Sequence, residues 1–312
     1  MARELDGATV LAQLPATGAR LVAANDREYP GALMDLFDPP AGLFVRGDRL
    51  DRLEPRVAIV GARNCSPAGR EIASILGGAL AGAGVCVVSG GALGIDAAAH
   101  RGALEEGTSV SVLGSGIDHA YPPQNRQLLE RVVTSGALVS EYPPGVPALP
   151  FRFPARNRII AALSRAVVVV EGAVGSGSMI TADHALDIGR EVFAVPGPVA
   201  GPLSAVPHFL IREGATLIRG PEDLLSDLGL EPVAAGVSGS EGAAPPSPQG
   251  LGSAERRVWE ALTVSSAPDR LASLTGLSLP EAVSALVGLE MRRLVIQMGG
   301  RYERRPMGGG ST

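Results

Sequence analysis

Short apolar runs alternate with segments of helical periodicity through most of this 312-residue chain. Strands are predicted at 57–60, 85–88, 109–113, 137–140, 166–170, 192–195 and 215–218, and helices at 67–81, 95–106, 123–133, 154–164, 179–188 and 203–213. The strands are apolar throughout rather than at alternate positions, which is typical of a parallel sheet covered on both faces by helices. The pattern therefore predicts an α/β fold with a doubly wound, Rossmann-like, mostly parallel sheet.

The two ends of the chain have a different pattern. Residues 1–56 are too few for a large domain, and we expect a short ordered lead-in to the Rossmann-like domain at 57–230. Residues 231–252 are rich in Gly, Ser, Ala and Pro, which is typical of a flexible linker. Residues 253–305 carry three helical patterns and a hairpin that turns at Gly299 and Gly300. This last segment predicts a small winged-helix domain.

Composition argues against several classes of protein. All 27 basic residues are arginine, so a Walker-type phosphate loop and Schiff-base chemistry, which both need lysine, are excluded. No apolar run reaches the roughly 18 residues of a membrane span, and residues 1–14 do not form a secretory signal. Cys65 and Cys86 have neither metal-site nor disulfide spacing. We therefore expect a cytoplasmic protein with no metal and no other cofactor.

The net charge of −5 argues against a uniformly basic DNA-binding surface. The acids are unevenly spread, however, because residues 221–250 hold five acids and no arginine. Residues 151–170 show the opposite bias, with four arginines and no acid. The sequence therefore leaves room for one local basic site.

Loops rich in glycine and serine follow several predicted strands. Arg63 and Ser66 follow the first strand, and the loops at 89–94, 114–118 and 171–178 follow three others. The carboxyl ends of parallel strands meet at one sheet edge, where backbone N–H groups and helix N-termini attract anions. Several such loops on one edge fit a polymer with many phosphates better than a single nucleotide.

The densest basic segment, residues 151–160, interleaves Phe151 and Phe153 with Arg152, Arg156 and Arg158. Arginines for phosphates and aromatic rings for bases are how proteins hold single strands, and each stacked base contributes about 1–3 kcal/mol. The alternative is that both phenylalanines lie in the core and the arginines form a solvated face. We favour the binding interpretation because no acid balances these arginines.

Three residues leave two interpretations open. Asp96 and His100 lie four apart on one predicted helix face, as a catalytic dyad or, as we favour, a hydrogen-bonded pair that holds the loop. Glu171 is either a general base or, as we favour, a hydrogen-bond acceptor for backbone or guanidinium groups. The sequence offers no separated acid/base pair, no nucleophile elbow and no metal set.

Taken together, these motifs resemble the DNA-processing protein A family, called DprA or Smf. The resemblance covers about residues 20–228. The C-terminal segment also resembles the family's winged-helix-like domain, but more weakly. The matching motifs are VAIVGAR at 57–63, SGGALGIDAAAH at 89–100, VLGSGIDHAYPPQN at 112–125, SEYPPG at 140–145, FPARNRIIAALS at 153–164, SGSMITADHAL at 176–186 and REVFAVPG at 190–197.

The resemblance implies a protein that is not an enzyme, binds single-stranded DNA, forms a homodimer through its Rossmann-like domain and loads the RecA recombinase during natural transformation. The DNA-binding residues that it implies are Arg63, Ser66, Ser89, Gly90, Gly91, Gly94, Arg152, Phe153, Arg156, Asn157, Arg158, Ser176, Gly177, Ser178 and Thr181. Family members often carry lysine near this surface, where we expect Arg152 to substitute. Residues 173–175 are neutral, so a cationic contact is expected to be missing there. The N-terminal helical module of many members is expected to be absent or truncated.

Two other functions compete with this one. The LOG-type phosphoribohydrolases have a similar fold and a P-G-G-x-G-T-x-x-E pattern, but the loop at 175–178 leads to Asp183 rather than to a matching glutamate. A dinucleotide-dependent oxidoreductase is disfavoured because the strict G-x-G-x-x-G fingerprint with its distant acid is missing. The predicted helix at 280–291 is acidic at Glu281 and Glu290, which favours a protein-contact or accessory role for the winged-helix segment.

Overall fold

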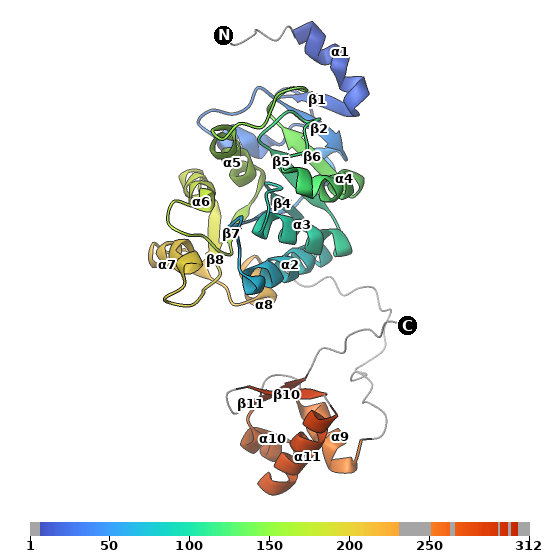
Figure 1. Ribbon diagram of the computed structural model, residues 1–312, viewed down its shortest axis with the longest axis vertical. Coiled ribbons are helices and arrows are strands. Elements are labelled where there is room, and N and C mark those ends of the chain that lie inside the picture. The colour runs from blue at the N-terminus through green and yellow to red at the C-terminus, as the bar shows by residue number, and fades with distance from the viewer. Residues whose placement is uncertain (1–6, 231–250, 263–265, 293, 299–300, 305–312) are drawn as a thin grey trace. The chain divides into compact units, whose positions relative to one another are not determined.

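The computed structural model describes residues 7–230, 251–262, 266–292, 294–298 and 301–304. The chain divides into two compact units, Met1–Ala234 and Ala235–Thr312, and each is considered by itself (Figure 1). The predicted linker at 231–252 falls almost wholly outside the described residues, as does the turn at 299–300.

Nine strands form one sheet in the first unit, in the order β1-β2-β6-β5-β4-β3-β7-β8-β9. Their bounds are β1 Ala19–Ala23, β2 Gly42–Gly47, β3 Arg56–Val60, β4 Cys86–Ser89, β5 Ser109–Leu113, β6 Gly136–Ser140, β7 Ala166–Val169, β8 Glu191–Ala194 and β9 Thr216–Leu217. Strands β3 to β9 pair in parallel, whereas β1 and β2 join antiparallel beyond β6. The predicted α/β class and its doubly wound, mostly parallel sheet are confirmed.

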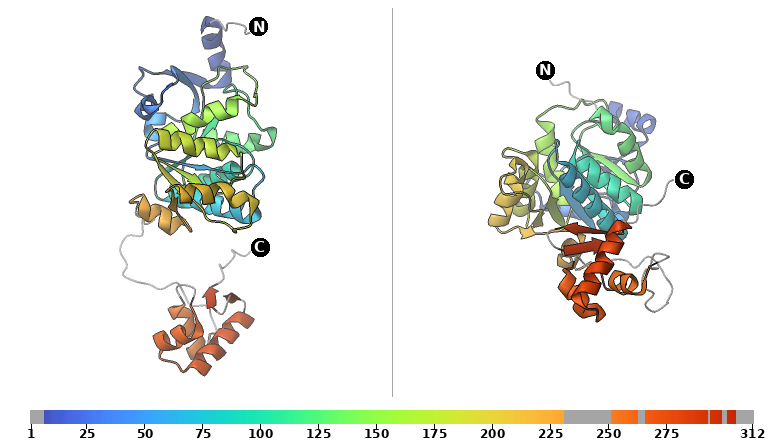
Figure 2. Two further views of the ribbon diagram at one scale, coloured as in Figure 1. Left: turned by 90° about the vertical axis from the view of Figure 1, so that its left-hand side faces the viewer. Right: turned by 60° about the horizontal axis from the view of Figure 1, so that its bottom comes forward.

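Helices cover both faces of this sheet (Figures 1 and 2). The helices of the first unit are α1 Gly7–Thr17, α2 Pro67–Gly82, α3 Ile95–Glu106, α4 Arg126–Thr134, α5 Arg152–Leu163, α6 Gly177–Asp187, α7 Ala205–Arg212 and α8 Pro221–Asp227. One apolar core lies between the sheet and α2, α3 and α8, and a second lies between the sheet and α5, α6 and α7. Buried on both faces, the central parallel strands are mostly apolar, although β5 also buries the small polar side chains of Ser109 and Ser111.

Within the described residues, 7–56 belong to the same unit as the central sheet rather than to a separate lead-in. Strand β1 pairs with β2, and β2 pairs with β6 of the central sheet, placing Phe44 opposite Ser140. Leu43 and Val45 of β2 are fully buried in the core. The segment is therefore part of the doubly wound unit, and a boundary at residue 57 does not correspond to a break in the fold.

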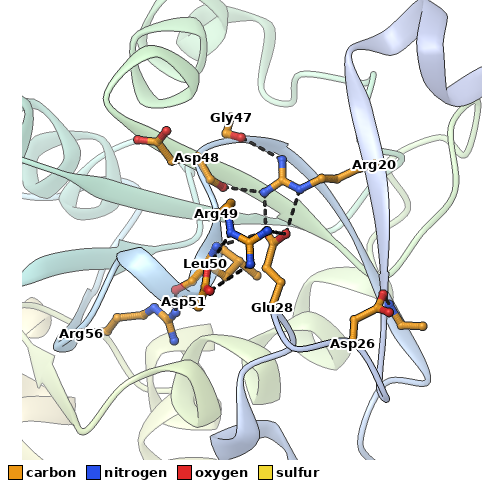
Figure 3. A network of polar contacts seen from close by, with 10 residues as sticks. Arg20, Asp26, Glu28, Gly47, Asp48, Arg49, Leu50, Asp51 and Arg56 are labelled. Atoms are coloured by element: carbon orange, nitrogen blue, oxygen red, sulfur yellow. Dashed lines mark hydrogen bonds and ion pairs between the residues drawn. The ribbon is translucent and has the colours of Figure 1, made fainter.

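A polar network holds this N-terminal segment in place (Figure 3). Glu28 is almost completely buried, and its carboxylate accepts hydrogen bonds from Arg20 and from the backbone N–H of Leu50 at 3.1 Å. Arg49 lies 3.9 Å away on the other side. Burial raises the pKa of Glu28, but the bonds from Arg20 and Leu50 outweigh it, so the net shift is downward.

The strand order has one reversal that matters for function. Strand β3 lies at the centre, the chain continues through β4, β5 and β6 on one side, and it then crosses to β7, β8 and β9 on the other. In open α/β sheets, ligands bind at the carboxyl ends of the strands where the order reverses. The fold therefore predicts a ligand-binding site at the loops that follow β3 and β7.

The second unit contains α9 Ser253–Ala261, α10 Pro268–Thr275, α11 Leu279–Met291 and the hairpin of β10 Val295–Met298 with β11 Arg301–Arg304. Its core includes Trp259, Leu271 and Leu286. Ser278 caps α11 in a capping box with Glu281. This is the three-helix-and-hairpin arrangement of a winged helix. Among the described residues no single helix is long and apolar enough to cross a membrane. Helices α10 and α11 taken together have the length and composition of a span, but they are bent by 109° relative to each other.

Candidate nucleic-acid interface

A cleft of 480 Å³ lies at the reversal point of the sheet. It is bounded by the loop after β3, by the first turn of α5 and by the first turn of α6. Eight of the fifteen predicted site residues line it: Arg63, Phe153, Arg156, Asn157, Ser176, Gly177, Ser178 and Thr181. A ninth, Gly90, lines a small adjoining pocket of 80 Å³.

The α6 N-terminus faces the cleft. Ser176 is the N-cap and accepts from the backbone N–H of Ser178, while the two hydroxyls lie 2.9 Å apart. Asn157 of α5 donates to the carbonyl of Gly177 at 3.0 Å and so ties the two helices together. The first turn of a helix carries partial positive charge and unpaired N–H groups, so this wall of the cleft suits a phosphate.

Arg63 brings a full positive charge to the same cleft. Its side chain is exposed, and its guanidinium lies 5.2 Å from the centre of the Phe153 ring. The loop that carries it is fixed by backbone bonds from Ala62 to Glu171 (2.8 Å) and from Ile95 to Ala62 (3.2 Å). The guanidinium of Arg63 thus lies beside an aromatic ring. Among the ion pairs of the described residues, none joins Arg63 to a carboxylate.

Two aromatic rings meet beside Arg63. The rings of Tyr121 and Phe153 are tilted by 36° with their centres 5.4 Å apart, and Tyr121 is 41% exposed. The list of predicted DNA-binding residues omits Tyr121, although Tyr121-Pro122-Pro123 stands directly after the third glycine-rich strand exit. An aromatic residue at such an exit is the signal that could have identified it.

Arg156 is a structural residue rather than an exposed contact. It is only 4% exposed, and it donates to the carbonyls of Gly90 (2.8 Å) and Val112. Burial lowers its pKa to about 10. Beside it, Asp96 accepts from the backbone N–H groups of Gly90 (3.1 Å) and Ala92 (3.3 Å), and burial raises the pKa of Asp96. The pair joins the loop after β4 to α3 and α5, and so forms the floor of the cleft.

The prediction that Asp96 and His100 form a hydrogen bond is wrong. His100 is fully buried, and its Nδ1 lies 2.7 Å from the Oγ of Ser109, which in turn donates to the carbonyl of Val87. Burial lowers the pKa of His100 to about 3, so the imidazole is neutral at ordinary pH. Asp96 alone secures the loop, and the two side chains do not form a dyad.

The N-terminus of α2 is already occupied by a carboxylate of the protein itself. Glu171 accepts from the backbone N–H of Ser66 at 2.8 Å and from its hydroxyl at 2.5 Å, which confirms its interpretation as a backbone acceptor. A Cβ atom on Gly69 would collide with the Glu171 carboxyl group, so glycine leaves the space for it. Ser66 is thus engaged with Glu171 rather than facing the cleft.

Six predicted residues line neither the cleft nor the adjoining pocket: Ser66, Ser89, Gly91, Gly94, Arg152 and Arg158. Ser89 is buried and donates to the carbonyl of Ile59. Gly94, at φ +81°, lets its loop pass against the carbonyl of Ala62, where a side chain would collide. These residues shape the loops around the cleft rather than its surface.

The two arginines of this group have other partners. Arg152 lies over the Tyr142 ring at 4.9 Å and donates to the carbonyl of Pro147. Arg158 is paired with Glu141 at 2.7 Å, and its side chain is only 15% exposed. The count of four arginines without a nearby acid in the sequence therefore overstated the free positive charge, because Glu141 approaches only in the folded chain.

The fold and this cleft define a class of protein: a Rossmann-like unit with a phosphate-suited cleft at the reversal point of its sheet, followed by a winged helix. Residues 20–229 match the family model of DNA recombination-mediator protein A, and residues 242–301 match that of the DprA winged helix domain. The chain belongs to the DprA family, as the sequence motifs indicated.

Individual relatives agree with this assignment. Protein Smf of Escherichia coli is 44% identical over 210 residues, which cover 67% of this chain and 56% of the relative, so the match spans little more than half of that protein. The X-ray structure of DprA from Streptococcus pneumoniae matches with a TM-score of 0.65 and 41% identity, covering 70% of this chain and 78% of the other. A DprA structure from Helicobacter pylori, described for its single-stranded DNA binding mode, matches with a TM-score of 0.61 and 28% identity, covering 67% and 95%.

Proposed function

We propose that the cleft binds single-stranded DNA, and that the protein is a recombination mediator that loads the RecA recombinase during natural transformation. The observation that carries the DNA-binding part is the grouping of Arg63, Phe153 and Tyr121 in the cleft that the α6 N-terminus also lines. One guanidinium and one helix terminus suit phosphates, and two rings suit bases.

Access to the bases favours a single strand over a duplex. Stacking on an aromatic side chain needs an unpaired base whose face is free, and in a duplex both faces are covered by neighbouring pairs. Tyr121 lines the cleft and 41% of its surface is exposed, so an unstacked base can reach it. The single-strand binding described for the Helicobacter pylori relative supports the same choice.

The contacts of the two acidic residues near the cleft support a non-enzymatic role. Glu171, the general base of a phosphoribohydrolase interpretation, is bound to Ser66 at the α2 N-terminus. Asp96 is buried among backbone donors. We propose further that the protein acts in the cytoplasm as a homodimer, the expectation that the family resemblance carries.

The DNA-binding proposal is tested by fluorescence anisotropy of a labelled oligo-dT and of a duplex of equal length, titrated with wild type, Arg63→Ala and Arg101→Ala. Arg101 is an exposed arginine of α3 that lines neither pocket, so it is a matched control. We expect preference for the single strand and a loss of affinity of roughly ten- to hundredfold with Arg63→Ala, since a charge-assisted hydrogen bond contributes about 1.5–3 kcal/mol. Arg101→Ala should bind as wild type does.

A salt series separates a phosphate contact from a fold defect. For single strands the slope of log K against log salt is about −0.7 per phosphate neutralised, so loss of Arg63 should make the slope shallower by about 0.7. Equal affinity of wild type and Arg63→Ala would remove Arg63 from the site. No binding of oligo-dT by wild type at low salt would refute the proposed function.

A further inference from the structure

A second cluster of one cation and two aromatic rings lies at the start of α5, outside the cleft. The guanidinium of Arg152 lies 4.9 Å from the centre of the Tyr142 ring and 5.6 Å from the centre of the Phe151 ring. Phe151 is 67% exposed, although burial of a phenylalanine ring is favourable. We call these three side chains the outer cluster. Its composition is that of the group in the cleft, which also joins one arginine to a phenylalanine and a tyrosine.

The positive charge of the outer cluster is available to a ligand. Arg152 donates to the carbonyl of Pro147, and none of the ion pairs of the described residues joins it to a carboxylate. The carboxylate of Glu141, which precedes Tyr142 in the chain, is paired with Arg158 at 2.7 Å. A guanidinium that stacks on a ring still presents N–H groups along its edge, and these suit a phosphate.

Backbone contacts hold the outer cluster in place without help from the Phe151 ring. The backbone N–H of Arg152 donates to the carbonyl of Leu149 at 3.0 Å, and that of Tyr142 donates to the hydroxyl of Ser140 at 2.9 Å. Phe151 is the N-cap residue of α5, but its side chain makes no capping hydrogen bond. The start of α5 therefore does not depend on this ring.

The outer cluster adjoins the cleft. Pro150 and Phe153 both line the cleft, and Phe151 and Arg152 lie between them in the chain. We propose that single-stranded DNA leaves the cleft over Pro150 and continues onto the outer cluster, where a base stacks on Phe151 and a phosphate meets Arg152. This inference rests on the proposed function, and it extends the binding site by a second stacking subsite.

Continuity with the cleft favours the same DNA strand over a separate partner. A strand bound in the cleft brings its next nucleotides to the rim, so their contact with the outer cluster is intramolecular and has a high effective concentration. A nucleotide also offers the two groups that the cluster needs together, which are a flat base for the ring and a phosphate for the guanidinium. Alternating arginines and aromatic rings are how proteins follow a single strand.

Anisotropy titrations of the full-length chain with two lengths of labelled oligo-dT test this subsite. The short strand, of about four nucleotides, is chosen to occupy the cleft alone, and the long one, of about twelve, reaches beyond it. We expect Phe151→Ala to weaken binding of the long strand at least fivefold, and of the short strand less than twofold. Phe37→Ala is the matched control, because Phe37 is a fully exposed phenylalanine that lines neither pocket of the site, and it should bind both strands as wild type does.

A salt series and a conservative variant identify the kind of contact. The slope of log K against log salt changes by about 0.7 for each phosphate neutralised on a single strand, so Arg152→Ala should make the slope for the long strand shallower by about 0.7. Phe151→Ala should leave this slope unchanged, because stacking neutralises no phosphate. Phe151→Tyr keeps an aromatic ring and should bind the long strand within about twofold of wild type.

The outcomes separate this inference from the function on which it rests. If Phe151→Ala bound the long strand as wild type does while Arg63→Ala lost affinity, the outer cluster would be overturned and the proposed function would stand. An equal loss of both strands in Phe151→Ala would also overturn it, because the ring would then act in the cleft rather than beyond it. Failure of wild type to bind either strand would refute the proposed function itself.

Discussion

Replacing His100 with glutamine should make the protein less sensitive to mild acid. In the folded protein, burial lowers the pKa of His100 from 6.5 to about 3. The unfolded chain takes up a proton near pH 6.5, so stability is lost as the pH falls below this value and continues to be lost until about pH 3. A pH of 5 is about 1.5 units below the pKa of the imidazole in the unfolded chain. At about 1.36 kcal/mol per unit, the free energy of unfolding falls by about 2 kcal/mol.

Urea unfolding of wild type and His100→Gln at pH 7 and pH 5 measures this loss. Far-UV circular dichroism follows unfolding, and fluorescence of Trp259, the single tryptophan, reports the second unit separately. Glutamine can still donate to the Ser109 hydroxyl, and any change in packing affects both pH values alike. The fall in the free energy of unfolding from pH 7 to pH 5 should be about 2 kcal/mol smaller in the variant. Equal falls in the two proteins would show that His100 takes up its proton in the folded state, and so refute the reasoning.

Three further predictions concern buried or paired polar groups of the first unit. Gly69→Ala should cost about 1–3 kcal/mol in urea unfolding, because the new methyl group collides with the Glu171 carboxyl group, whereas an unchanged midpoint would mean that Glu171 moves freely. Glu28→Gln should cost about 2 kcal/mol, since it weakens two charge-assisted bonds to a nearly buried carboxylate, and calorimetry that finds no drop in Tm would contradict this. Arg158→Ala should leave oligo-dT affinity within about twofold of wild type, because its guanidinium is paired with Glu141 away from the cleft, and a loss as large as that of Arg63→Ala would bring Arg158 back into the site.

The sheet was predictable because its parallel strands are buried on both faces. Strand β7 is apolar at every position, and β5 combines Val and Leu with two small serines and is followed at once by Gly114, so these strands show in the sequence. Strands β1 and β2 carry no such signal. The burial of β2 depends on its pairing with β6, which lies about 90 residues further along the chain, and a pattern read locally contains no information about that pairing.

The position of the candidate site could be predicted from the sequence, but the roles of its individual residues could be predicted only in part. Strand-end loops converge on one edge by geometry, and this brought Arg63, Phe153 and the first turn of α6 together as expected. The roles of charged residues were harder, because their partners are distant in sequence. Arg156 is drawn into the core by the carbonyls of Gly90 and Val112, from other strands, and no count of local charges reveals that.

The central claim, that single-stranded DNA lies in the cleft at the reversal point of the sheet, is tested most directly by photocross-linking. An oligo-dT that contains 4-thiothymidine is bound to the full-length protein and irradiated, and the modified peptides are identified by mass spectrometry. The account predicts cross-links at Tyr121 and Phe153, whose rings meet beside Arg63, and their loss in excess unlabelled oligo-dT. Cross-links confined to the winged-helix unit, or to the face that carries Arg158, would contradict it.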